Sequence, residues 1–201
     1  MSDAAVFSGV QAYVLTARDV FCGTVASLLG VHGTVVDDVV VWQGPPYMGR
    51  NRSAICARFL QSSFETLVMV DADMEFDAAA LATLIDASVT TGGVVGGLYV
   101  SARRGGGELF LEAWRQGDDG RLVALDTPPA GLDAVDAVGA GLIVIPRRVL
   151  EVVPAPWFPD RADEDLRFCV AARAERVPVF VHGGVLVAHA RTLPFYPGGD
   201  R

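Results

Sequence analysis

The chain has 201 residues, of which 51% are hydrophobic, and a formal net charge of −8. This length fits one compact α/β domain that buries roughly 70% of the surface its unfolded form would expose. All sixteen basic residues are arginine, which excludes chemistry that needs lysine, such as the Walker-type phosphate loop and Schiff-base catalysis. The acidic charge also disfavours a broad nucleic-acid-binding surface.

The chain shows no signal for a membrane or for export. No apolar stretch approaches the roughly 18 residues that a bilayer-spanning helix needs, and no basic cluster precedes an apolar segment near residue 1. We therefore expect no membrane span and a cytoplasmic location, in a bacterium or a host cell. Cys22, Cys56 and Cys169 are far apart, which indicates reduced thiols rather than disulfides or zinc ligands.

Hydrophobic periodicity alternates between strand and helix patterns, which is typical of a mostly parallel sheet with helices on both faces. In the first half we predict strands at residues 11–16, 35–42, 66–70 and 94–100. Helices should run from Asp19 to about Gly30, over 51–62 and after Asp77, with the two aspartates as N-caps. This half, residues 11–100, has the pattern of a nucleotide-binding βαβ arrangement.

The second half, residues 101–193, changes character. The loop at 101–107, with Arg103 and Arg104 among glycines, either closes over the donor or is simply exposed. The other predicted elements are a hairpin of 108–114 with 121–126 around 117–120, a strand at 141–145, helices at 147–153 and 163–175, and strands at 177–181 and 185–189. We predict a single domain over 1–193 and a flexible tail over 194–201.

Two aspartates follow the apolar strand at 66–70, in the sequence Asp71-Ala72-Asp73. Ligands of open α/β sheets bind at the carboxyl ends of the strands. Carboxylates at this spacing can hold Mn²⁺ or Mg²⁺, one as a chelator and the other through water or on a ribose hydroxyl. The cation would neutralise a departing diphosphate. The alternative is a loop in which the aspartates only cap a turn.

Four segments resemble GT-A glycosyltransferases, especially the compact family-2-like members of bacteria and phages. They are GRNRSAI at 49–55, ETLVMVDADMEF at 65–76, AVGAGLIVIPR at 137–147 and DEDLRFC at 163–169. The resemblance implies the GT-A fold, a Rossmann-like α/β domain with the DXD motif at 71–73. In such a domain residues 11–100 would bind the nucleotide sugar and residues 101–193 would form the acceptor side. It also implies metal-dependent transfer of a sugar from a nucleoside diphosphate sugar, UDP- or GDP-linked, to an acceptor hydroxyl.

The helix start near residue 50 is a candidate part of the donor site. Arg50, Asn51 and Arg52 follow a Gly-rich loop, where guanidinium and backbone N–H groups can meet phosphate or a nucleobase edge. A solvated helix end is the alternative. With the resemblance included, the predicted nucleotide-sugar site consists of Thr16, Arg18, Arg50, Asn51, Asp71, Ala72 and Asp73. The segment at 16–18 lacks the proline of the family.

The resemblance makes Asp165 the general base, with Glu164 beside it. Such a base would deprotonate the acceptor hydroxyl for in-line attack, which predicts inversion at the anomeric carbon. On the residues alone, the acidic run at 163–165 could simply place negative charge in the first turn of a helix, where the helix dipole favours it.

His189 ends an apolar strand, and neutral imidazole is a competent Mn²⁺ ligand. The resemblance places it in a metal site with Asp71 and Asp73, whereas a lone histidine on an apolar strand is more often structural. His32 and His182 precede glycines and are predicted turn or loop residues.

The predicted acceptor side includes Gly141 and Trp157. Trp157 and Phe158 either form an apolar platform for a ligand or belong to the core. The acceptor is open among a polysaccharide, a lipid-linked sugar, a protein side chain and a hydroxymethylated base in phage DNA, and the acidic charge counts against DNA. Two alternative functions are a sugar-phosphate nucleotidyltransferase, and a non-catalytic module that binds nucleotide sugars.

Overall fold

The structure is a computed structural model that describes residues 9–16, 19–45, 47–102 and 109–190. The predicted site residue Arg18, the loop arginines Arg103 and Arg104, and the predicted tail lie outside the described residues. In the described part, no helix is both long enough and apolar enough to cross a membrane.

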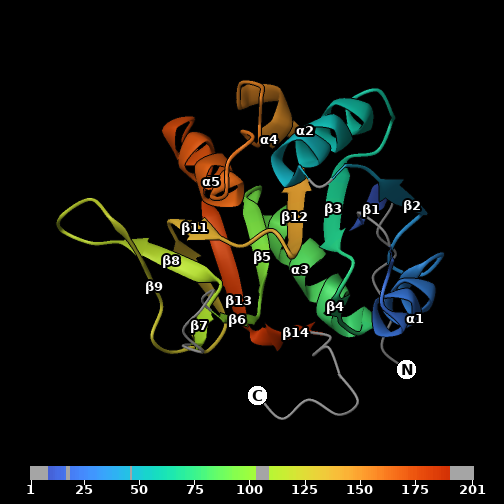
Figure 1. Cartoon of the computed structure of the whole chain (residues 1–201), viewed down its shortest axis with the longest axis horizontal. Coiled ribbons are helices and arrows are strands. Elements are labelled where there is room, and N and C mark those ends of the chain that lie inside the picture. The colour runs from blue at the N-terminus through green and yellow to red at the C-terminus, as the bar shows by residue number, and fades with distance from the viewer. Residues whose placement is uncertain (1–8, 17–18, 46, 103–108, 191–201) are drawn as a thin grey trace, which may run out of the picture.

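Helices and strands alternate through the first half of the chain, and the second half is richer in short strands (Figure 1). The helices are α1 (Cys22–Val31), α2 (Met48–Phe59), α3 (Ala78–Thr91), α4 (Arg147–Val152) and α5 (Glu164–Ala174). The strands are β1 (Val10–Thr16), β2 (Asp38–Gln43), β3 (Thr66–Asp71), β4 (Met74–Glu75), β5 (Val94–Leu98), β6 (Val100–Ala102), β7 (Leu109–Leu111), β8 (Ala113–Gln116), β9 (Leu122–Ala124), β10 (Leu132–Val135), β11 (Ala137–Val138), β12 (Leu142–Pro146), β13 (Val179–Leu186) and β14 (Ala188–His189).

A seven-stranded sheet forms the centre of the molecule, in the order β10-β13-β5-β12-β3-β1-β2. Strands β1, β2, β3, β5 and β13 run in one direction, while β12 and β10 run against their neighbours. The predicted α/β sheet is therefore confirmed. Because most strands are parallel, their carboxyl ends gather at one edge of the sheet.

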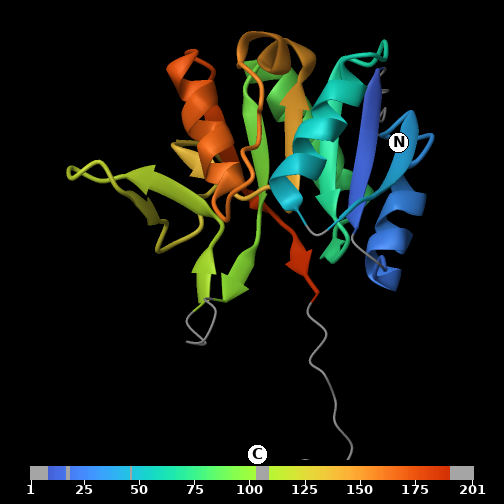
Figure 2. The same ribbon diagram turned by 45° about the horizontal axis from the view of Figure 1, so that its top comes forward.

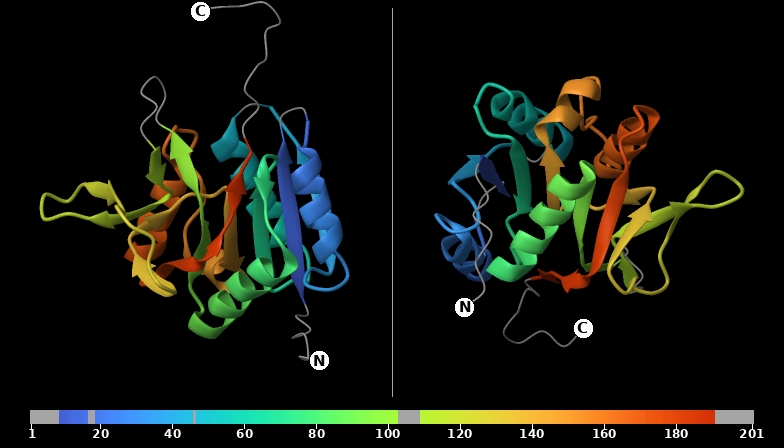
Figure 3. Two further views of the ribbon diagram at one scale, coloured as in Figure 1. Left: turned by 90° about the horizontal axis from the view of Figure 1, so that it is seen from below. Right: turned by 180° about the vertical axis from the view of Figure 1, so that it is seen from behind.

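The sheet is covered on both faces because its central strands are apolar on both sides. In β3, Leu67 and Met69 share a core with helices α2, α4 and α5, while Val68 and Val70 share a second core with α1 and α3. Figure 3 shows these two helical layers on opposite sides of the sheet. The hairpin of β8 and β9 projects away from this body (Figure 2). Period-two alternation of buried side chains thus fixes the layered arrangement.

Several local predictions need correction. The first helix begins at Cys22 after Phe21, and Asp19 instead accepts a hydrogen bond from Thr16 through its main-chain oxygen. The predicted hairpin forms with its turn at 117–120, but its first strand starts at 113, because residues 109–111 pair with β6. His182 lies within β13 rather than in a turn. The cap at Asp77 is confirmed, since its side chain accepts a hydrogen bond from the N–H of Ala80.

Candidate functional site

The carboxyl end of β3 carries the aspartates at the centre of the site. Asp71 is the last residue of β3, and its N–H donates to Gly141 O at 2.8 Å. The turn that follows is tied to the start of α1, because Ala72 O accepts from Phe21 N at 2.9 Å and from Thr24 Oγ1 at 3.0 Å. The side chains of Asp71 and Asp73 are 26% and 34% exposed, so both remain accessible to a ligand.

Arg52 holds the first of these aspartates in place. Its guanidinium donates from Nη2 to Asp71 Oδ1 at 2.7 Å and Oδ2 at 2.9 Å, and from Nη1 to Glu164. The side chain is only 4% exposed. The buried guanidinium of Arg52 therefore joins the strand that ends in Asp71 to the helix that begins at Glu164.

The sequence analysis chose the neighbours of Arg52, Arg50 and Asn51, as site residues, but their side chains have other partners. Arg50 is 68% exposed and pairs with Asp160, and Asn51 donates from Nδ2 to Pro45 O at 2.6 Å. A signal for Arg52 was present, because it shares the buried stripe of α2 with residues 55, 56 and 59 at spacings of three, four and seven. A charged residue in such a stripe requires a buried partner.

The backbone between β11 and β12 connects the other side chains of the site. Ala140 N donates to Asp165 Oδ2 at 3.3 Å, and Gly141 N donates to Tyr99 Oη at 3.0 Å. A Cβ atom at Gly139 would collide with Tyr99 Oη and lie 2.8 Å from Glu112 Oε2. The glycines thus let Tyr99 and Glu112 approach the main chain closely, and the contact with Ala140 N places Asp165 in the same site as Gly141.

Asp73 and His189 form a second pair at this edge of the sheet. Strand β14 pairs with β4, so that His189 lies opposite Met74, and Ala190 N donates to Asp73 O at 2.8 Å. His189 Nε2 lies 3.2 Å from Asp73 Oδ2. The two residues are far apart in the sequence, and tertiary structure alone brings them together.

The donor atoms of this pair suit a divalent cation of the Mn²⁺ type. Carboxylate and imidazole together form a mixed oxygen and nitrogen set, and a catalytic cation is often held by one or two protein ligands with substrate phosphates completing the shell. Among the residues that the structure describes, no group of three His, Cys, Asp or Glu side chains forms a ligand cluster. Asp71 as a further ligand stays a prediction, because both its oxygens accept from Arg52.

Three polar residues in the site had no place in the sequence analysis: Tyr99, Ser101 and Glu112. Ser101 Oγ lies 3.4 Å from His189 Nδ1, and Glu112 Oε2 comes close to the main chain at Gly139. The rings of Tyr99 and His189 meet edge to face, with centroids 5.5 Å apart. The sequence around these three residues mixes polar and apolar side chains, and nothing in its pattern distinguishes them from exposed strand residues.

Negative charge dominates the site. Burial raises the pKa of Asp71, and Asp73 and Asp165 add to this effect while Arg52 opposes it. Burial likewise raises the pKa of Glu164 and of Glu112 above their ordinary values. The guanidinium of Arg52 stays charged, because the surrounding carboxylates outweigh the effect of burial on its pKa. A site of this kind favours a bound cation.

Other predicted residues have structural partners. Trp157 donates from Nε1 to Leu150 O at 2.9 Å and packs against the core, and Phe158 stacks on Phe168 with centroids 4.5 Å apart. Thr16 is buried at the end of β1 and donates from Oγ1 to Asp19 O at 2.8 Å. Their roles in binding a donor or an acceptor stay predictions.

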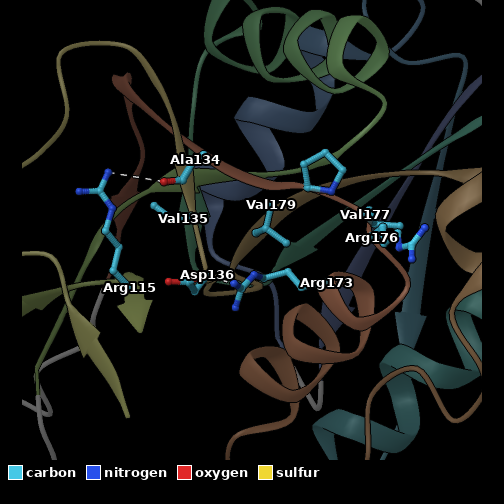
Figure 4. Close-up of a pocket in the computed structure, with 9 residues that line it drawn as sticks. Arg115, Ala134, Val135, Asp136, Arg173, Arg176, Val177 and Val179 are labelled. Atoms are coloured by element: carbon cyan, nitrogen blue, oxygen red, sulfur yellow. Dashed lines mark hydrogen bonds and ion pairs between the residues drawn. The ribbon is translucent and has the colours of Figure 1, made fainter. Parts of the chain in front are cut away.

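An arginine-lined cavity lies apart from this site, between β8, β10 and the end of α5 (Figure 4). Arg115 donates to Asp133 and lies 3.5 Å from Ala134 O, and Arg173 lies 2.6 Å from Asp136. No predicted site residue lines the cavity. Because Arg115 and Arg173 are paired with aspartates, this cavity is a weaker candidate for a functional site than the carboxylate site.

Solved structures with this architecture include "GalNAc-T7 with UDP, GalNAc and Mn2+", at a TM-score of 0.68 and 11% identity, over 96% of this chain and 45% of that one. The fold is of the GT-A type. Another similar structure is A197 from STIV, at a TM-score of 0.64 and 15% identity, over 96% of this chain and 99% of that one. No known family and no curated protein matches by sequence.

Proposed function

We propose that this chain is a metal-dependent glycosyltransferase that moves a sugar from a nucleoside diphosphate sugar to an acceptor hydroxyl. The proposal rests on one observation. The Asp71–Asp73 segment, Asp165 and His189 come from three separate parts of the chain, and hydrogen bonds link them into one site at the carboxyl edge of a GT-A sheet.

Each of these residues has a role that its surroundings support. Asp73 and His189 would hold Mn²⁺ or Mg²⁺, which stabilises the charge of the departing diphosphate. Asp71, fixed by Arg52, would accept a hydrogen bond from a ribose hydroxyl. Asp165 would take the proton of the acceptor hydroxyl, because it is partly exposed and held beside Gly141 through Ala140 N.

Glu164 has a different role from Asp165. Its side chain is only 9% exposed and is paired with Arg52, so it is poorly placed to exchange a proton with an acceptor. We assign it to positioning of the helix that carries Asp165. Attack by the deprotonated hydroxyl opposite the diphosphate predicts an inverted product.

The finer parts of the proposal concern the donor and acceptor. UDP is the nucleotide bound in the GalNAc-T7 structure, which makes a UDP-sugar the first donor to test, followed by GDP-sugars. The acceptor can be a glycan hydroxyl or a hydroxymethylated base in phage DNA. The net charge of −8 favours a glycan.

The test is release of free nucleoside diphosphate from a panel of UDP-, GDP-, CDP- and TDP-sugars, with Mn²⁺ and with EDTA. Wild-type protein should release nucleotide only with the metal, and Asp73→Asn should reduce release by at least about tenfold. Asp86→Asn is the matched control, since Asp86 is an exposed carboxylate on α3.

Three outcomes would contradict the proposal. Binding of a donor without release under any condition would indicate a non-catalytic module. Turnover of a nucleoside triphosphate with a sugar phosphate would indicate a nucleotidyltransferase. Full activity in EDTA would refute the role of the cation.

A further inference from the structure

A short buried segment between β11 and β12, residues 139–141, is the point where two parts of the site meet. The carbonyl oxygen of Gly141 accepts from Asp71 N at 2.8 Å. The N–H of Ala140 donates to Asp165 Oδ2 at 3.3 Å. Through these two bonds, the segment joins the strand that ends in Asp71 to the side chain of Asp165.

Tyr99 packs against the same segment. Gly141 N donates to Tyr99 Oη at 3.0 Å, in a hydrogen bond that is buried. A Cβ atom at Gly139 would collide with Tyr99 Oη, and one at Gly141 would lie 2.8 Å from both Oη and Cζ. Tyr99 itself is only 7% exposed. The phenol therefore lies directly on the main chain of the two glycines, and its hydroxyl satisfies the N–H of Gly141.

The glycines explain why this segment needs anchors. Glycine adopts a wider range of backbone conformations than any other residue, so a segment with two of them keeps one geometry only through outside contacts. The N–H of Gly139 donates to Glu112 O at 3.0 Å, and the N–H of Gly141 donates to Tyr99. Ala140 lies between these two anchors. Removal of the Tyr99 hydroxyl would therefore free one side of Ala140 and let it shift.

The ring and the hydroxyl of Tyr99 have separate contacts. The ring meets His189 edge to face, with centroids 5.5 Å apart, whereas the hydroxyl bonds to Gly141. Phenylalanine at this position would keep the ring beside the Asp73 and His189 pair and remove only the bond to the segment. The two contributions can thus be separated by one substitution.

We infer that Tyr99 is a positioning residue whose hydroxyl fixes the segment 139–141 and, through it, the place of Asp165 relative to Asp71. The inference rests on the proposed function, in which Asp165 takes the proton of the acceptor. Tyr99 acts through Asp165 and has no role of its own toward donor or acceptor. A displacement of about 1 Å can cost about 100-fold in rate, so one hydroxyl behind the site can control transfer.

The first test is a double-mutant cycle on sugar transfer. Tyr99→Phe should lower kcat by about 10-fold to 100-fold and leave the donor KM and the Mn²⁺ affinity unchanged. In an Asp165→Ala background, the same substitution should have almost no further effect on the residual rate, because residues that act as a unit are not additive. A general loss of folded protein would lower the rate equally in both backgrounds.

Tyr13→Phe is the matched control for this cycle. Tyr13 is a similarly buried tyrosine in β1, and its ring lies near that of Trp42 rather than on the glycine segment. Its substitution should leave kcat unchanged, both with Asp165 present and in the Asp165→Ala background.

Amide hydrogen exchange, followed by nuclear magnetic resonance, tests the segment without any measurement of activity. In Tyr99→Phe, the N–H groups of Ala140, Gly141 and Asp71 should lose protection, and that of Gly141 by about 10-fold or more, because its buried N–H has lost its acceptor. Amides of β1 should keep their protection, which separates a local change from a global loss of stability.

Unchanged protection of the Gly141 N–H in Tyr99→Phe would overturn the inference, and so would an equal fall in kcat with and without Asp165. Absence of nucleotide release from the wild-type protein would instead refute the proposed function. In that case, loss of protection at Ala140, Gly141 and Asp71 would still support the positioning role of Tyr99. The two failures are therefore distinguishable.

Discussion

Replacement of Arg52 by methionine tests how the site is held together. Methionine keeps much of the length of the side chain and removes the charge. The change leaves Asp71 and Glu164 without their guanidinium partner, and Ala140 O loses a contact at 3.4 Å. A buried charged group that loses its partner destabilises the folded state, because neither water nor another protein group then stabilises its charge.

The expected loss of stability follows from the exposure of the two carboxylates, Asp71 and Glu164. Glu164 is 9% exposed and cannot be hydrated in place, whereas Asp71 is 26% exposed, so that water takes up part of its charge. Removal of one partner from a buried ion pair costs about 3–5 kcal/mol. At about 2–4 °C per kcal/mol for a chain of this size, the midpoint of thermal unfolding should fall by about 6–20 °C.

The assay is thermal and urea unfolding at neutral pH, followed by circular dichroism, with Arg50→Met as the matched control. Arg50 also lies near the start of α2 and also pairs with an aspartate, but it is 68% exposed, so its loss should cost at most about 1 kcal/mol. Adding Glu164→Gln to Arg52→Met should recover part of the lost stability. Equal effects of Arg52→Met and Arg50→Met would refute the assignment of Arg52 as a buried clamp.

Two further predictions concern Glu112 and Gly139. Burial raises the pKa of Glu112, so its charge costs stability above the folded pKa and nothing below the unfolded value of about 4.3. Glu112→Gln should therefore raise the urea midpoint at neutral pH, and the gain should vanish as the pH falls below about 4; a gain that persists in acid would contradict this reasoning. Gly139→Ala should cost about 1–3 kcal/mol, because its Cβ would collide with Tyr99 Oη. Gly131→Ala, where a Cβ would meet nothing within 4 Å, is the control, and equal urea midpoints for the two variants would refute the predicted clash.

Much of the fold was predictable because its signals are local. The apolar run of β3 and the cap at Asp77 each depend on neighbouring residues, and the structure has both. The short strand β4 was not predictable, because it has two residues and exists only through its pairing with β14, which lies within the predicted strand at 185–189. The first strand of the β8 and β9 hairpin was predicted to start at residue 108, but it starts at 113, because residues 109–111 pair with β6.

The candidate site divides in a similar way. Asp71 and Asp73 followed from their place at the end of a strand, whereas Asp165 and His189 followed from the resemblance to GT-A glycosyltransferases, and the structure brings all four to one edge of the sheet. Arg52 was overlooked in favour of Arg50, because the choice between adjacent arginines depends on which face of α2 meets β3 and α5.

By itself, the sequence determined the layered α/β class, the strand that ends in Asp71 and the absence of lysine chemistry. Only the tertiary structure decided that Arg52 joins Asp71 to Glu164, and that Ser101 contacts His189. The reason is physical. Periodicity and capping act over a few residues, whereas a buried charge finds its partner through the packing of elements that are distant in the chain.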